Sequence, residues 1–196
     1  MITTTQQILI TLVKDFSLVH TASSLAEHLR RSRWGVWKIL KKLQEIEIIT
    51  IKNTGKGKTS TQTIHLNWQC KLTEKIISLA LAEEASAYKR WDFTFADVEK
   101  DVDFLLLYGS FLHSPKTAGD IDILIVAQEK KLLNINKCIF TIQKSQEKKI
   151  HANNFTPKEF AQELQQSNKV FIDALNRGII LFGQEKFVAF VKGFHQ

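Results

Sequence analysis

The sequence predicts an α+β protein built from two small domains. Residues 1–70 contain three stretches with apolar side chains at helical spacing, followed by two strand-like stretches on either side of a glycine-rich turn. The rest of the chain contains two short, wholly apolar runs, which are typical of buried strands, among segments of helical pattern. The 196 residues are enough for one large domain or two small ones.

The excess positive charge lies almost entirely in the first third of the chain. Residues 1–70 hold 10 Lys and Arg against 4 Asp and Glu, whereas residues 71–196 hold 17 against 16, so +6 of the net +7 falls in the first part. This asymmetry favours a polyanion as the partner of residues 1–70. A domain that is basic without binding a polyanion would give the same count.

Three further features indicate a cytoplasmic protein with no membrane partner. Cys70 and Cys138 are far apart and lack metal-ligand spacing, as expected of free thiols in a reducing compartment. No apolar run reaches the roughly 18–20 residues that a membrane span needs. Residues 1–14 are polar and then amphipathic, unlike a signal peptide.

The first domain is predicted to contain three helices and a hairpin. Apolar spacing predicts a helix over residues 4–15, and Thr21 and Ser32 are candidate N-caps of two more helices. Alternating or continuous apolar residues predict strands, and NTGKGK forms a basic turn between them. The expected ranges are residues 21–30 and 32–46 for the second and third helices, and 46–52 and 61–68 for the strands.

This order of elements resembles that of winged helix-turn-helix domains. The resemblance implies that cations of the third helix enter a DNA major groove and that the hairpin tip contacts phosphate. Of Trp34 and Trp37, one is expected to close the core and the other to be exposed. A solvated basic face on a protein-interaction module is the alternative. The candidate nucleic-acid-binding residues are Arg31, Arg33, Lys38, Lys41, Lys56 and Lys58.

Residues 71–91 are expected to form a connector helix, which leaves residues 92–196 for the second domain. In that domain the apolar run 104–108 ends abruptly in Gly109 and Ser110. Asp120 and Asp122 then lead into a second apolar run, 123–126.

These four polar positions predict a site for a metal ion and a nucleotide. Strand alternation puts Asp120 and Asp122 on one face, about 7 Å apart, where their oxygens suit Mg²⁺ or Mn²⁺. Gly109 allows the backbone to approach a phosphate closely, and Ser110 offers a hydroxyl and an N–H group. Such groups orient and neutralise a triphosphate.

The segment LLLYGSFLHSPKTAGDIDILIV resembles the core of the polymerase-β-like nucleotidyltransferase superfamily, in particular its minimal branch. The resemblance is strongest over residues 104–126 and extends over about 92–185. It implies a mixed sheet with flanking helices, phosphate binding by Gly109 and Ser110, and metal binding and catalysis by Asp120 and Asp122. It also implies transfer of a nucleoside monophosphate from a Mg²⁺-bound triphosphate, with ATP as the expected nucleotide, to an acceptor hydroxyl. In a related antitoxin branch that hydroxyl belongs to a partner toxin protein.

The sequence departs from the family pattern in three places. Nine residues separate Ser110 from Asp120, one fewer than is usual in this branch, and His113 and Ser114 replace an Arg-Gly pair. Active members often carry a third carboxylate on a later strand, but the corresponding residues 148–155 contain no acid. His151 on that strand is either a base or, more simply, a structural residue. The departures support an alternative function, a DNA-binding regulator whose second domain only binds nucleotide or mediates association.

The other segments of the second domain are interpreted as scaffold. A helix is expected over 129–149, with Leu132, Leu133, Ile139 and Ile142 in the core. Thr156 begins a capping box for the next helix, Gly178 terminates another, and residues 179–182 form an edge strand. Lys116, Lys144 and Lys148 are candidate contacts for triphosphate, with an unspecific surface position as the alternative for each.

Overall fold

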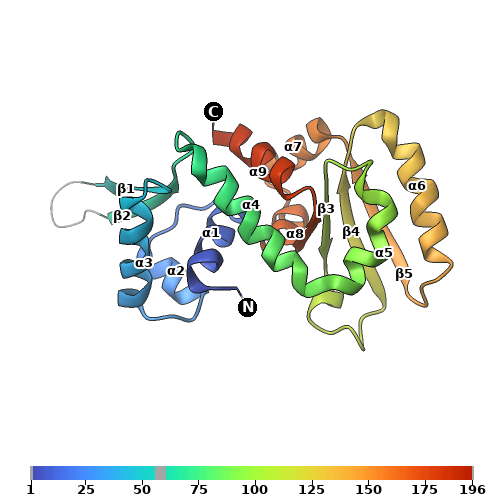
Figure 1. Ribbon diagram of the computed structural model, residues 1–196, viewed down its shortest axis with the longest axis horizontal. Coiled ribbons are helices and arrows are strands. Elements are labelled where there is room, and N and C mark those ends of the chain that lie inside the picture. The colour runs from blue at the N-terminus through green and yellow to red at the C-terminus, as the bar shows by residue number, and fades with distance from the viewer. Residues whose placement is uncertain (1, 56–60, 196) are drawn as a thin grey trace. The chain divides into compact units, whose positions relative to one another are not determined.

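The computed structural model describes residues 2–55 and 61–195 (Figure 1). The chain divides into two compact units, the first ending at Ala80 and the second running from Leu81 to Phe194. The division falls within a single helix, α4 (Lys71–Ala85). The predicted fold class, an α+β protein that contains a mixed β-sheet, is confirmed.

The first unit consists of three helices, a two-stranded antiparallel hairpin and the start of α4. Thr21 and Ser32 cap their helices, since the hydroxyl of each accepts a hydrogen bond from a backbone N–H three residues later. An isolated bridge between His20 and Ile64 ties the hairpin to the segment before α2. The elements are α1 (Thr4–Lys14), α2 (Ala22–His28), α3 (Arg33–Glu45), β1 (Ile49–Thr54) and β2 (Thr61–Leu66).

The first strand begins three residues later than the sequence predicts. α3 ends at Glu45, and Glu47 adopts a positive φ of 59° as the chain turns. Ile46 is therefore exposed instead of starting a strand. The segment predicted as a strand, residues 46–52, therefore contains a turn as well as the beginning of β1.

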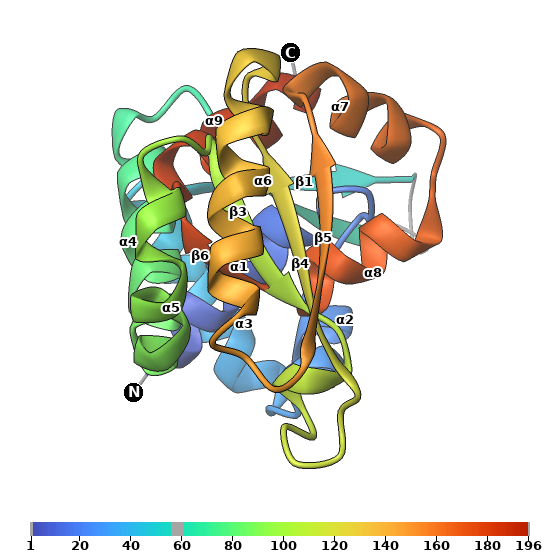
Figure 2. The same ribbon diagram turned by 90° about the vertical axis from the view of Figure 1, so that its right-hand side faces the viewer.

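The second unit is a four-stranded sheet of order β5-β4-β3-β6, with helices on both faces (Figure 2). β4 and β5 are parallel, whereas β3 is antiparallel to both β4 and β6. The strands are β3 (Phe104–Tyr108), β4 (Asp120–Val126), β5 (Lys149–Phe155) and β6 (Ile179–Phe182). The helices are α5 (Lys89–Glu99), α6 (Glu129–Gln143), α7 (Pro157–Gln165), α8 (Lys169–Arg177) and α9 (Gln184–Lys192).

Alternation along the strands sends side chains into two separate apolar layers. Ile121, Ile123 and Ile125 of β4 belong to a core that includes residues of α5 and α6. On the other face, Phe104 of β3 packs against aromatic rings of α7 and α9, with the Phe104 and Phe187 centroids 5.3 Å apart. Both views show α5 and α6 on one side of the sheet and α7 to α9 on the other (Figures 1 and 2). The second face is covered by apolar groups over only part of its length, and its polar end forms the candidate site.

Two expectations about the scaffold are wrong. Residues 71–91 do not form one helix, because α4 ends at Ala85 and a 3-10 turn leads into α5. The helix expected over 129–149 ends at Gln143, and Leu133 is exposed on it, while Ile135 is fully buried. The expectation that Gly178 terminates a helix is confirmed, because Gly178 is the C-cap residue of α8. No element was predicted after residue 182, where α9 lies.

Candidate functional site

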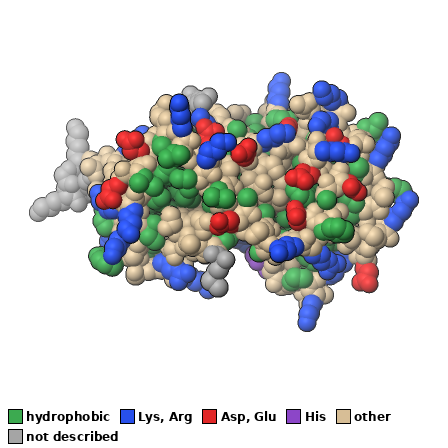
Figure 3. Space-filling model, in the orientation of Figure 1, with side chains coloured by type: hydrophobic (Ala, Val, Ile, Leu, Met, Phe, Trp, Pro, Cys, Tyr) green, Lys and Arg blue, Asp and Glu red, His purple; other side chains and the backbone are tan. Residues whose placement is uncertain are grey.

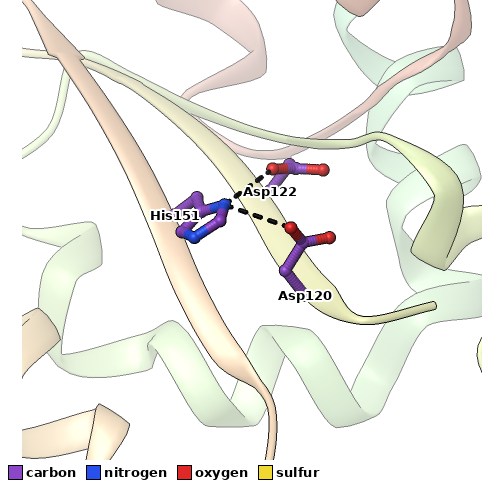
Figure 4. A group of neighbouring side chains, drawn as sticks. All are labelled: Asp120, Asp122 and His151. Carbon is purple, nitrogen blue, oxygen red and sulfur yellow. Dashed lines mark ion pairs between the residues drawn. The ribbon is translucent and has the colours of Figure 1, made fainter.

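The two predicted acids lie at the start of β4 and point to the same face of the sheet. His151 of the parallel neighbour β5 is the register partner of Asp122. Figure 4 shows its imidazole directed at both carboxylates, with Nδ1 3.2 Å from Asp120 Oδ2 and 3.7 Å from Asp122 Oδ1. One ligand atom from each of the three residues lies within 4.8 Å of the others, so the cluster can hold a metal ion.

Strand β3 closes the other side of Asp122. Tyr108 is the register partner of Asp122 on β3, and its hydroxyl accepts a hydrogen bond of 2.7 Å from Asn153 Nδ2 on β5. This bond spans β4 on the face that carries Asp122. Asp122 is thus held between Tyr108 and His151, which makes it the most enclosed of the three candidate ligands.

The turn after β3 brings the predicted glycine against the same carboxylate. Gly109 has φ 85° and ψ −168°, a conformation that only glycine adopts readily. A Cβ atom at this position would lie 2.3 Å from Asp122 Oδ2. The backbone at Gly109 therefore lies against the cluster of Asp120, Asp122 and His151, and the exposed Ser110 begins the following 3-10 turn.

A cavity of about 430 Å³ adjoins this turn within the second unit. Tyr108, Gly109 and Ser110 line one side of it. The opposite side is one face of α8, at a spacing of three to four residues, and includes the cation of Arg177. These α8 residues were not predicted from the sequence to be part of the site, because their position opposite the turn depends on tertiary packing. They are Val170, Asp173, Ala174 and Arg177.

Burial and charge both act on the acids of this site. Partial burial raises the pKa of Asp122 above its ordinary value of 3.8, and the neighbouring charge of Asp120 raises it further. The charge of His151 and its hydrogen bond act in the opposite direction. Burial likewise raises the pKa of Tyr108, the hydrogen bond with Asn153 lowers it, and the charges of both acids raise it by smaller amounts. A bound cation would relieve the repulsion between the two carboxylates.

We expect Asp122→Asn to stabilise the metal-free protein at pH 8, by up to about 1 kcal/mol. The pKa of Asp122 is higher in the folded state than in the unfolded state. Its favourable contribution to stability is therefore complete below pH 3.8 and is lost as the pH rises through the raised pKa. The amide removes this loss while keeping the shape of the side chain. Urea denaturation in EDTA at pH 8 and pH 4 measures the effect, and Asp97→Asn, an exposed position on α5, is the control. A lower stability of Asp122→Asn at pH 8 would contradict the prediction.

Lys148 makes its contact with the protein itself. Its ammonium group donates a hydrogen bond to the carbonyl oxygen of Ala118 and lies 5.8 Å from the centroid of the Phe111 ring. Lys148 thereby fastens the start of β5 to the loop before β4. A triphosphate would have to displace these contacts to engage it.

The candidate nucleic-acid-binding residues lie in the first unit. Arg31 precedes α3, and Arg33, Lys38 and Lys41 lie on it, all four with exposed side chains. Arg33 also lines a groove between α3 and the hairpin. Lys56 and Lys58 lie outside the described residues. Trp34 is exposed, whereas Trp37 is half-buried.

Comparison of the chain with protein-family models, curated proteins and solved structures found no match. Within residues 2–55 and 61–195, no helix combines the length and apolar character that crossing a membrane requires.

Proposed function

We propose that the second unit is a metal-dependent transferase that acts on a nucleoside triphosphate. More specifically, it would be a minimal nucleotidyltransferase of the polymerase-β-like type, joined to a nucleic-acid-binding winged helix. The observation that carries the proposal is the cluster of Asp120, Asp122 and His151, which adjoins the glycine turn that begins the nucleotide motif.

The metal ligands fit this chemistry in number and type. Two carboxylates on one strand and an imidazole on the next offer three donor atoms on one face of a rigid sheet. Carboxylates suit Mg²⁺ and Mn²⁺, and the imidazole favours a metal that also accepts nitrogen. When bound, the cation would neutralise charge on the triphosphate.

The groups beside the cluster support binding of a polyphosphate. The Ser110 hydroxyl is exposed at the beginning of a 3-10 turn, next to a cavity that also receives Arg177. The pKa of Asp122 is raised first by partial burial and then by the charge of Asp120, a combination that is common at functional sites. Asp120, Asp122 and His151 would hold the cation, while Gly109, Ser110 and Arg177 would orient the phosphates.

The first unit supports the nucleic-acid part of the proposal. Three helices precede an antiparallel hairpin, and the third helix carries Arg33, Lys38 and Lys41 on exposed positions. Lys and Arg side chains are suited to phosphate contacts that position a protein on a nucleic acid. The unit would bring the transferase to its site of action or regulate transcription.

Incubation with each α-labelled nucleoside triphosphate tests the transferase function directly. The purified protein, Mg²⁺ or Mn²⁺ and a cell extract are combined, and label on any acceptor is followed. We expect transfer that is lost, by at least about 100-fold, in Asp120→Asn/Asp122→Asn, because both carboxylate ligands are removed. The control is Asp92→Asn/Asp97→Asn, which changes the charge equally on exposed positions of α5.

The possible outcomes distinguish the two candidate functions. Label transfer that only the first double variant abolishes supports the enzyme. Metal-dependent nucleotide binding without transfer supports a regulator that senses nucleotide, a function favoured by the histidine at the position of a third acid. Absence of both metal and nucleotide binding would refute the proposed function of the second unit.

A further inference from the structure

Two tryptophans on α3 form an exposed aromatic surface in the first unit. Trp34 is 72% exposed, and Trp37 lies three residues later on the same side of the helix. The core side of α3 is instead formed by Val36, Leu40 and Leu43, which are at most 4% exposed. Trp34 therefore contributes little to the core, and its indole ring is available for contacts at the surface.

Both indole rings line a groove of about 800 Å³ between α3 and the hairpin. The other side of the groove carries hydrogen-bonding side chains of β1 and β2, namely Asn53, Thr61 and Gln62. Arg33 lies at its edge, at the first position of α3. The groove thus combines flat aromatic surfaces with groups able to recognise the polar edges of a ligand.

Each tryptophan is paired with a cation. Lys38 Nζ lies 5.3 Å from the centroid of Trp34, and Lys41 Nζ lies 4.9 Å from that of Trp37. The acid of α3, Glu45, is in the last turn, away from both rings. Figure 3 shows basic (blue), acidic (red) and apolar (green) side chains interspersed on one face of the molecule. Charge alone therefore does not define a binding surface on that face. The groove differs because the charged side chain among its described lining residues is a cation, Arg33, and it adjoins the aromatic rings.

This combination matches single-stranded nucleic acid better than a duplex. In a duplex the flat faces of the bases are stacked on one another, and only their edges reach the grooves. Unpaired bases expose those faces and stack on aromatic side chains, while cations contact the phosphates between them. We propose that the α3 groove binds single-stranded DNA or RNA by stacking unpaired bases on Trp34 and Trp37. This inference rests on nucleic-acid binding by the first unit and is independent of the metal site.

The test compares the affinities of the full-length protein for labelled 20-nucleotide single strands of DNA and RNA and for a duplex of the same length. We expect at least one single strand to bind about 10-fold more tightly than the duplex and to quench tryptophan fluorescence. Trp34→Ala should weaken single-strand binding by about 10-fold or more, and Trp34→Phe should retain part of it. Phe93→Ala, at an aromatic residue of the second unit that is 85% exposed, should change nothing. Circular dichroism checks that each variant is folded.

The remaining outcomes separate the failure of this inference from that of nucleic-acid binding itself. Equal or tighter binding of the duplex, with no effect of Trp34→Ala, would overturn stacking but leave the proposed DNA-binding role intact. If no nucleic acid binds at low salt, both proposals fail, and the tryptophan pair becomes a protein contact surface.

Discussion

Replacement of Gly109 by alanine is expected to lower metal affinity by about 10- to 100-fold, the usual cost of disturbing a group that orients a metal ligand. The added Cβ would lie 2.3 Å from Asp122 Oδ2, so the carboxylate or the turn must move. The conformation at φ 85° and ψ −168° is also strained for alanine, which should lower the free energy of unfolding by about 1–3 kcal/mol. Metal titration and urea denaturation measure the two effects.

A second glycine in the same loop provides a matched control. Gly119 precedes Asp120 directly, and a Cβ placed on it would have no neighbour within 4 Å. Gly119→Ala should therefore leave metal affinity nearly unchanged. Equal affinities of the Gly109 and Gly119 variants would mean that the close approach of the turn to Asp122 has no part in metal binding.

Several residues of the candidate site could be predicted from local patterns in the sequence. Alternation along one strand is sufficient to put Asp120 and Asp122 on the same face, and the structure has them there. Gly109 follows a buried strand directly, so its place at the end of β3 was also local information. His151 was different, because its contact with both acids depends on β5 pairing in parallel with β4 in one particular register. An isolated histidine in a sequence does not reveal that pairing, and a structural role was the simpler interpretation.

The distinction between local sequence signals and tertiary packing also explains which predictions about the scaffold were wrong. The capping box at Thr156 is a short-range signal, and the structure contains both of its hydrogen bonds. Leu133, by contrast, has the spacing of a core residue but is 69% exposed, since the rotation of α6 on the sheet selects Ile135, Ile139 and Ile142 instead. The break between α4 and α5 contains no proline or glycine, so composition gave no sign of it.

His151→Asp is expected to shift the metal preference of the site from Mn²⁺ towards Mg²⁺. The wild-type cluster contains one nitrogen ligand, which Mg²⁺ accepts poorly, whereas the variant would offer three carboxylates. We expect the ratio of Mg²⁺ to Mn²⁺ affinity to rise about 10-fold. The third acid adds repulsion in the absence of metal, so the variant should be less stable than wild type in EDTA and recover when metal is added. If the second unit is a transferase, activity with Mg²⁺ should rise as well.

Asn153→Asp is the control variant for His151→Asp, because it adds a carboxylate to the same face of β5 without replacing His151. Asn153 lies two residues along the same face of β5, and its side-chain amide donates a hydrogen bond to the Tyr108 hydroxyl, on the side of Tyr108 and away from the cluster of Asp120, Asp122 and His151 named above as a candidate metal site. Both variants acquire a carboxylate on this face, but only His151→Asp has it at a ligand position. Competition between Mg²⁺ and Mn²⁺, followed by the paramagnetic signal of free Mn²⁺, gives the affinity ratio for each protein. A similar shift in the two variants would show that the general electrostatic field sets the preference, and His151 would then lose its assignment as a ligand.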